Sequence, residues 1–265
     1  MKTYISADIE GTTGIASWSE TELSNEDSKY FRNQMTKEVN AACEGVIESG
    51  CTDILVKDAH DSARNIDPSK LPECVKIMRG WTKDPLSMMS GIDKTFDAAI
   101  FTGYHSAAGT CGNPLAHTED LNNDYVKING KFISEMEINA YAAAYAGVPI
   151  VLVTGDKLVC ETAKELNKNI KTVAVNEGMG NASISINPNL ALKLIKKAAS
   201  EALKDDLSKY MIELPENFKI EVRFREHWRA NKGSYYPGAK RVDPKTISYE
   251  NSDYFEILRF MHFVL

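Results

Sequence analysis

The chain alternates between short, almost continuously apolar segments and longer segments whose apolar positions repeat every three or four residues. The short segments have the composition of strands buried in a parallel sheet, because helices cover both faces of such a sheet. They lie at residues 3–8 (TYISAD), 53–58 (DILVKD), 74–78 (CVKIM), 97–103 (DAAIFTG), 149–156 (PIVLVTGD) and 171–175 (KTVAV). This alternation predicts an α/β fold.

The longer segments predict helices. Residues 25–49 carry an apolar residue at every third or fourth position, and Gly50 follows as a natural stop. Ser134 is expected to cap a helix over residues 135–146, because its hydroxyl can accept a hydrogen bond from the first turn. Further helices are predicted over residues 157–167 and 189–210.

The C-terminal part of the chain has a different pattern. Asn129 and Gly130 stand between two alternating runs (VKINGKFI), which predicts a β-hairpin. After Leu214 come a strand-like segment (FKIEVRF), a turn and a last helix. We therefore predict a mostly parallel or mixed sheet flanked by helices in residues 1–214, and a smaller C-terminal α+β lobe in residues 215–265 that completes the same unit.

Composition narrows the functional classes. The net charge of −6 over 265 residues argues against a nucleic-acid-binding surface, which usually needs a basic stripe. No apolar run approaches the ~20 residues that span a bilayer, and Asp8 and Glu10 interrupt the N-terminal apolar run, so no signal peptide is predicted. Five dispersed cysteines without C-x-x-C spacing are typical of reduced thiols. We expect a cytoplasmic protein with neither a nucleic-acid nor a membrane partner.

Carboxylates and imidazoles follow the ends of the predicted strands. Asp8 and Glu10 end the first strand, His60 follows the second, and His105 follows a later one. The carboxyl ends of parallel strands meet at one crevice, where ligands bind, and residues two apart in an extended chain point the same way. Such a mixture of oxygen and nitrogen donors suits zinc, manganese or cobalt. Glu135, which starts a predicted helix, is a fifth candidate ligand.

Each of these residues has a simpler explanation when taken alone. His60 could pair at the surface with its aspartate neighbours, and His105 could be a loop histidine with satisfied hydrogen bonds. Cys111, six residues before His117, could be a nucleophile only if it were paired with a base. The combination favours a metal site, because a divalent cation removes the repulsion between clustered acids.

Five motifs carry a resemblance to a known family. SADIEG, KDAHDS, TGYHS, AHT and SEMEINAY occur in the order and spacing of the zinc-dependent D-aminopeptidase family, and the likeness extends over essentially the whole chain. No single motif is distinctive, but their ordered combination is specific. The resemblance implies a binuclear zinc metallopeptidase that hydrolyses N-terminal residues, expected to be D-amino acids, from short peptides or amides with a metal-activated water.

The same resemblance assigns roles to residues. It implies that His117 is a catalytic group that stabilises the oxyanion or donates a proton to the leaving amine. It also implies a homo-oligomer, because family members form ring-like decamers. Two zinc ions per chain would be held by Asp8, as the bridging ligand, and by Glu10, His60, His105 and Glu135.

The chain departs from the family pattern in ways that leave other functions open. Ser134 and Glu137 stand where the family commonly has glycines, and Cys111 stands in the loop before His117. One alternative is another metal-dependent amidase or hydrolase, such as a phosphoesterase, for which the loops near the metal ligands offer only Arg64 as a cation. The other is a non-catalytic small-ligand-binding protein, against which the presence of all five ligand positions and His117 weighs.

Overall fold

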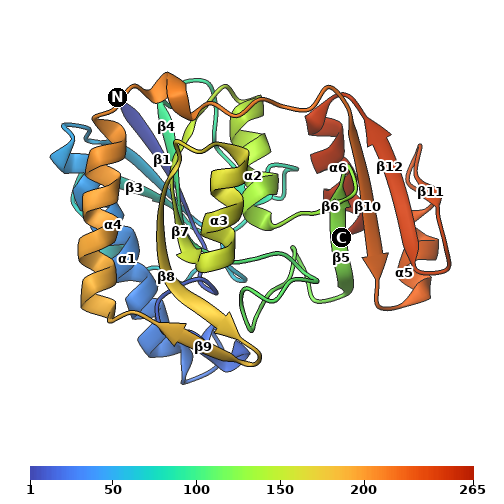
Figure 1. Cartoon of the computed structure of the whole chain (residues 1–265), viewed down its shortest axis with the longest axis horizontal. Helices are drawn as coiled ribbons and strands as arrows, with labels where there is room; N and C mark the ends of the chain where they lie inside the picture. The colour runs from blue at the N-terminus through green and yellow to red at the C-terminus, as the bar shows by residue number, and fades with distance from the viewer.

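The computed structural model describes all 265 residues and contains two sheets (Figure 1). The larger sheet has seven strands in the order β3-β2-β1-β4-β7-β8-β9, and every neighbouring pair is parallel except β8 and β9. Its strands are β1 (Lys2–Ala7), β2 (Asp53–Asp58), β3 (Val75–Met78), β4 (Ala98–Tyr104), β7 (Ile150–Asp156), β8 (Lys171–Met179) and β9 (Ala182–Ser185). The α/β class and the mixed, mostly parallel sheet are confirmed.

Helices cover both faces of the larger sheet. One pair, α1 and α4, packs on one face, while α2 and α3 cover the other (Figure 1). Every residue of β4 and β7 is buried as a result, which explains why these strands read as continuous apolar runs. The helices are α1 (Ser28–Glu48), α2 (Glu135–Tyr145), α3 (Lys157–Leu166) and α4 (Pro188–Leu203).

The smaller sheet is antiparallel, with the order β11-β12-β10-β5-β6. Its strands are β5 (Asn123–Ile128), β6 (Lys131–Phe132), β10 (Phe218–Phe224), β11 (Lys240–Arg241) and β12 (Thr246–Asn251). The predicted hairpin is confirmed, because β5 and β6 pair across Asn129 and Gly130, both of which have positive φ, as a type I′ turn requires. Two more helices, α5 (His227–Gly233) and α6 (Tyr254–Val264), pack on this sheet.

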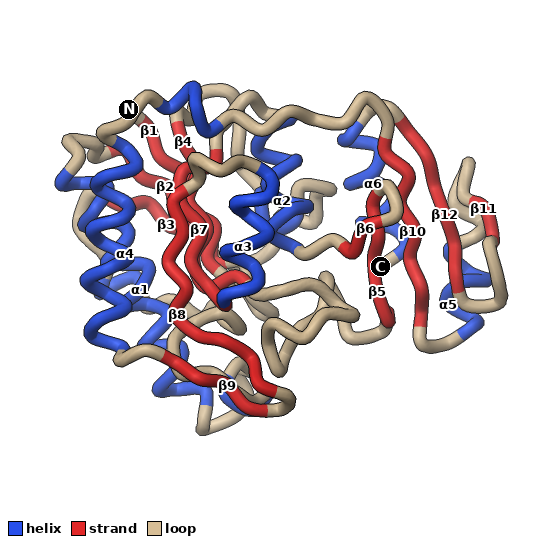
Figure 2. Tube along the Cα trace, viewed as in Figure 1, coloured by secondary structure: helices blue, strands red, loops and turns tan.

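The chain passes between the two sheets more than once (Figure 2). A long loop runs from β4 in the larger sheet to β5 in the smaller one, and α2 then leads back to β7. The division at residue 214 stays a prediction, and the sheet of the C-terminal lobe includes two strands that precede this boundary. No helix is both long and apolar enough to cross a membrane.

Two details of the sequence-based assignment are wrong. The helix predicted to continue to residue 210 ends at Leu203, and a separate 3₁₀ turn, η4 (Leu207–Tyr210), follows. The side chain of Asp206 accepts a hydrogen bond from the Ser208 N–H and so starts this new turn. The prediction also lacks β9, β11, β12 and α5.

Candidate metal centre

The fold brings the polar strand ends together. β1 lies between β2 and β4, so the residues that follow these three strands meet at one edge of the larger sheet. Asp8 and Glu10 follow β1, His60 follows β2, and His105 follows β4. Glu135 reaches the same place as the first residue of α2. The structure thus gathers all five residues for which metal binding was predicted.

Two histidines face carboxylates on either side of Asp8. His60 Nδ1 lies 3.4 Å from Asp8 Oδ1 and 3.1 Å from Glu10 Oε2. His105 Nε2 lies 3.5 Å from Asp8 Oδ2 and 3.5 Å from Glu135 Oε2. The two oxygens of Asp8 therefore face different imidazoles, which is the arrangement that a bridging carboxylate needs.

Backbone carbonyls fix which ring nitrogen of each histidine faces the acids. The second nitrogen of His60 lies 3.2 Å from the carbonyl oxygen of Thr21, and that of His105 lies 3.0 Å from the carbonyl oxygen of Ser106. A carbonyl can only accept, so these nitrogens are the N–H donors. In the neutral imidazole the other nitrogen then presents a lone pair to the carboxylates, which is the state of a metal-binding histidine.

Several buried polar atoms of the cluster lack a hydrogen-bond partner. They include Asp8 Oδ2, both carboxylate oxygens of Glu10, and His105 Nε2. All three residues are at most 2 % exposed. Unpaired buried polar atoms are costly, and here acceptor atoms face one another, so a cation between them would make the arrangement favourable. The donors fit a divalent metal ion that binds oxygen and nitrogen.

The pKa values reflect the electrostatic repulsion between the buried carboxylates. Burial and the charge of Glu10 raise the pKa of Asp8 to about 8. Burial lowers the pKa of His60, but the Glu10 and Asp8 carboxylates outweigh it and raise that pKa well above its usual value. In the absence of metal ions the cluster therefore holds protons, which metal binding would release.

His117 lies at the edge of this cluster. Its Nε2 is 3.5 Å from Glu135 Oε1, and its ring stacks on His105 with the centroids 4.3 Å apart. Its Nδ1 lies 3.0 Å from the carbonyl oxygen of Leu115, so Nε2 faces the cluster. Burial, together with His105, lowers the pKa of His117. Donor atoms of His105, His117 and Glu135 lie within 4.8 Å of one another, so the catalytic role predicted for His117 stays a prediction.

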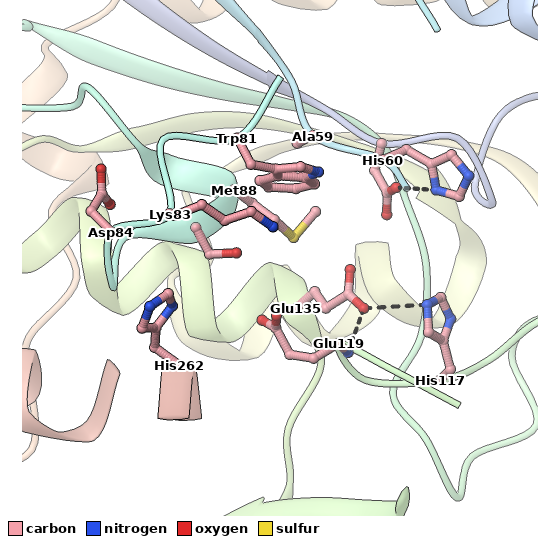
Figure 3. Close-up of a pocket in the computed structure, with 12 residues that line it drawn as sticks. Ala59, His60, Trp81, Lys83, Asp84, Met88, His117, Glu119, Glu135 and His262 are labelled. Atoms are coloured by element: carbon pink, nitrogen blue, oxygen red, sulfur yellow. Dashed lines mark hydrogen bonds and ion pairs between the residues drawn. The ribbon is translucent and has the colours of Figure 1, made fainter. Parts of the chain in front are cut away.

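The cluster opens into a cavity of about 340 Å³ (Figure 3). Asp8, His60, His117 and Glu135 line it at one end. The sequence-based reasoning missed several other lining residues, because they come from separate loops and from α6 and no local pattern joins them. These are Ala59, Trp81, Lys83, Asp84, Ser87, Met88, Glu119 and His262.

Among these residues, Glu119 could most easily have been proposed from the sequence, because it follows His117 by two positions. Its φ of +65° lies in the left-handed region, where a residue other than glycine is uncommon and strained. Its backbone N–H donates to Glu135 Oε1 at 2.7 Å, which ties this loop to the candidate ligand. Burial and the charge of Glu135 raise the pKa of the Glu119 carboxyl to about 8.

Buried aspartates hold the loops that carry two of the histidines. Asp58 accepts hydrogen bonds from the backbone N–H groups of Asn65 and Ile66, and the Asn65 amide donates to the His60 carbonyl. Asp156 accepts the Ser106 N–H at 2.6 Å and also caps α3. The turn after β1 needs Gly11, because a Cβ there would overlap the carbonyl of Tyr104.

The departures from the family pattern lie outside the cluster. Ser134 and Glu137 form a capping box at the start of α2: the Ser134 hydroxyl accepts from the Glu137 N–H, and Glu137 Oε2 accepts from the Ser134 N–H at 2.8 Å. Glu137 therefore stabilises the helix that presents Glu135. Cys111 is exposed and does not line the cavity.

Comparisons with known proteins identify relatives along the full length of the chain. A family model described as D-aminopeptidase matches residues 1–263. A D-aminopeptidase of Bacillus subtilis (strain 168) is 29 % identical over 263 residues, which cover 98 % of this chain and 95 % of the relative. A similar solved structure is the Zn-dependent D-aminopeptidase DppA from Bacillus subtilis, described as a self-compartmentalizing protease. It has a TM-score of 0.91 and 28 % identity, with 100 % of this chain and 96 % of that chain covered.

Proposed function

Because the chain belongs to the D-aminopeptidase family, we propose that it is a zinc-dependent aminopeptidase that releases N-terminal residues, D-amino acids in particular, from short peptides or amides. One observation carries the proposal: imidazoles and carboxylates meet at adjacent strand ends beside a cavity, and four of their buried atoms lack a hydrogen-bond partner. These atoms are Asp8 Oδ2, both carboxylate oxygens of Glu10, and His105 Nε2. The zinc dependence of the similar solved structure supports zinc as the metal.

The proposal includes two zinc ions per chain. Asp8, Glu10 and His60 would hold one ion, and Asp8, His105 and Glu135 would hold the other. The opposite directions in which the two oxygens of Asp8 face support its role as the shared ligand. Bound zinc supplies a Lewis acid for the scissile carbonyl and lowers the pKa of water, which makes water a nucleophile at neutral pH.

The remaining residues of the site would transfer a proton and hold the metal ligands in their orientations. His117 keeps Nδ1–H on the Leu115 carbonyl, so its Nε2 is the atom that would carry a proton to the leaving amine or stabilise the oxyanion. Glu135 lies beside this nitrogen and would favour its protonated form. The Thr21 and Ser106 carbonyls keep the lone pairs of His60 and His105 directed at the carboxylates between which the metals would bind.

The alternatives fit the cavity less well. A phosphoesterase needs cations for its anionic substrate, but the cavity is lined by four carboxylates against one lysine, Lys83. Arg64, the other cation considered, does not line it. A different metal-dependent amidase and a non-catalytic binding protein remain as outcomes of the assay below.

The proposal extends to assembly and location. We propose a homo-oligomer, a decamer by family resemblance, and the description of the similar structure as self-compartmentalizing supports assembly. A monomer in light scattering would contradict it. A cytoplasmic location is supported by the five free cysteines.

An assay of purified protein against paired D- and L-aminoacyl amides and short peptides tests the function. The protein is measured after chelation and again after zinc is restored. We expect D-selective release of the N-terminal residue that disappears with the metal and returns with about two equivalents of zinc. Hydrolysis of amides alone would favour another amidase, and metal binding without turnover would favour a binding protein.

A further inference from the structure

A second cavity, lined by six apolar residues and by Ser87, Glu119, Asp120, Asn139 and His262, adjoins the cavity lined by the candidate metal ligands. It has a volume of about 170 Å³, and its apolar walls come from a loop after β3, from α2, and from the end of α6 with the C-terminal residue. We call it the apolar annex. Its apolar lining residues are Pro85, Leu86, Ile138, Leu258, Met261 and Leu265.

The annex and the cavity lined by the candidate metal ligands share part of their walls. Ser87, Glu119 and His262 line both of them, so these residues form the junction. Figure 3 shows Glu119 between Glu135 at the metal end and His262 on α6. A molecule whose carbonyl lies at the metal end therefore has an apolar space within reach on the far side of Glu119.

Glu119 supplies the carboxylate of the junction. Its backbone is held in a strained conformation by the hydrogen bond to Glu135, but no lysine, arginine or histidine lies within ion-pair distance of its carboxylate. A partly buried acid beside other acids gains most from a cationic partner. The α-ammonium group of a peptide is such a partner, and it is attached to the same carbon atom as the side chain of the N-terminal residue.

We propose that the N-terminal residue of the substrate is bound at this junction, with its ammonium group on Glu119 and its side chain in the apolar annex. The inference rests on the proposed function and deepens it: the preferred substrates carry an apolar, branched or long N-terminal side chain such as leucine, rather than alanine. Hydrophobic pockets discriminate by roughly 10–200-fold for each methylene group. A leucine-to-alanine preference of at least about 10-fold in kcat/KM is therefore expected.

The first test compares D-leucinamide with D-alaninamide, which differ only in the side chain. Leu86→Trp narrows the annex, so it should lower kcat/KM for leucinamide more than kcat/KM for alaninamide and reduce the leucine preference to near one. Leu190→Trp, on the exposed side of α4, is the matched control and should leave both values unchanged. A wild-type ratio near one, or a ratio that Leu86→Trp does not change, would overturn the proposal.

Two further variants keep the test decisive if Leu86→Trp does not fold. Met261→Ala enlarges the annex and should raise kcat/KM for D-phenylalaninamide relative to D-leucinamide. Glu119→Gln removes the charge and should raise KM for both D-leucinamide and D-alaninamide by a similar factor without changing their ratio or the zinc content. An unchanged KM in Glu119→Gln would show that the ammonium group of the substrate does not bind Glu119.

Binding of free amino acids separates this inference from the proposed function. Calorimetry with D-leucine and D-alanine on zinc-loaded protein needs no turnover. Tighter binding of D-leucine that Leu86→Trp abolishes would support the annex even if no amide were hydrolysed, in which case only the proposed function would fail. Equal affinities for the two amino acids would overturn the annex even in an active enzyme.

Discussion

The polar residues of the site come from two regions that are held in place by different means. Asp8, His60 and His105 follow strands of the larger sheet, and backbone pairs such as Ala7 with Asp58 and Ala7 with Thr102 fix where these strands end. His117 and Glu119 belong instead to the loop between β4 and β5.

Single side-chain contacts position that loop. The Thr118 hydroxyl donates to the Ile133 carbonyl and accepts from the Ala108 N–H, while the Asn123 amide donates to the Thr118 carbonyl. Under the proposed function, the strand-end residues bind the metals, whereas the loop residues orient and protonate the bound molecule. Changes in the two regions should therefore have separable effects.

The largest effect is expected at the strand ends. Asp8→Asn removes the charge that faces both His60 and His105, so metal binding should fall well below two equivalents. Because metals supply several kcal/mol of transition-state stabilisation, turnover should drop on the order of 10³-fold or more. Elemental analysis and kcat are measured on the same sample. A variant that keeps two zinc ions would contradict the ligand assignment.

In the loop, His117→Ala should leave the zinc content and the fold intact and lower kcat by roughly 10²–10⁴-fold, the usual range for an acid–base group. This outcome would separate the loop from the strand ends directly. Loss of zinc in the same sample would instead make His117 a ligand, as its position beside Glu135 permits. Turnover close to that of the wild type would remove His117 from the mechanism.

Asn123→Ala tests whether the side-chain contacts hold the loop in place. The buried Asn123 amide donates to the carbonyls of Thr118 and Asp120, and the variant leaves both without this donor. We expect a loss of about 1–3 kcal/mol in the free energy of unfolding. Turnover should fall roughly 10-fold or more, as for other partners of site residues, with unchanged zinc content. The exposed Asn217→Ala serves as a control, and equal turnover in the two variants would refute the positioning role.

Glu137→Ala removes the capping box at the start of α2 and should have a smaller effect. The loss of a cap is expected to lower the free energy of unfolding by about 1 kcal/mol and the melting temperature by about 2–4 °C. Zinc content and kcat should not change, because Glu137 Oε2 bonds to Ser134 and not to the cluster. Thermal denaturation and the amide assay measure both quantities, and an effect on zinc binding would give Glu137 a role at the site.

The last prediction concerns stability alone, at Lys57 near the end of β2. Its ammonium group donates to the carbonyls of Asp58 and Gly80 and lies over the ring of Trp81. Burial lowers its pKa to about 8, below the ~10.4 of an unfolded chain. Between these values the unfolded chain binds more protons, so the contribution of Lys57 to stability increases as the pH rises from about 8 to about 10.4.

Urea denaturation of the wild type and Lys57→Met at pH 8 and pH 10 measures this contribution. The free energy of unfolding of the wild type should increase relative to that of the variant over this interval. A difference that stays constant with pH would show that Lys57 titrates alike in the folded and unfolded chains.

The sequence predicts the larger sheet well, because its central strands are buried on both faces. Their continuous apolar runs are too short for buried helices, so length favours strands. β1, β2, β4 and β7 were all expected. β9 was missed because it is a four-residue edge strand, half of whose residues are exposed. The end of α4 was missed because Asp206 starts a new turn by a side-chain bond that helical periodicity does not reveal.

Some residues of the site could likewise be predicted from the sequence, and others could not. The strand-end residues could be proposed from sequence because parallel strands bring their carboxyl ends together. Glu119 depends on a strained backbone, and the apolar annex joins residues from positions 85–86, 138 and 258–265, which meet only through the packing of α6 on α2. Such a surface has no local signal in the chain.

The crossing of the chain between the two sheets has a consequence for biosynthesis. The loop with His117 and Glu119 leads into β5, whose neighbour β10 is made about ninety residues later, since Ile128 pairs with Ile220. β10 in turn pairs with β12 near the C-terminus. A ribosome-bound chain can thus assemble most of the larger sheet while this loop still lacks its support. Contacts between such distant segments form slowly, so the loop with His117 and Glu119 should become ordered late in folding.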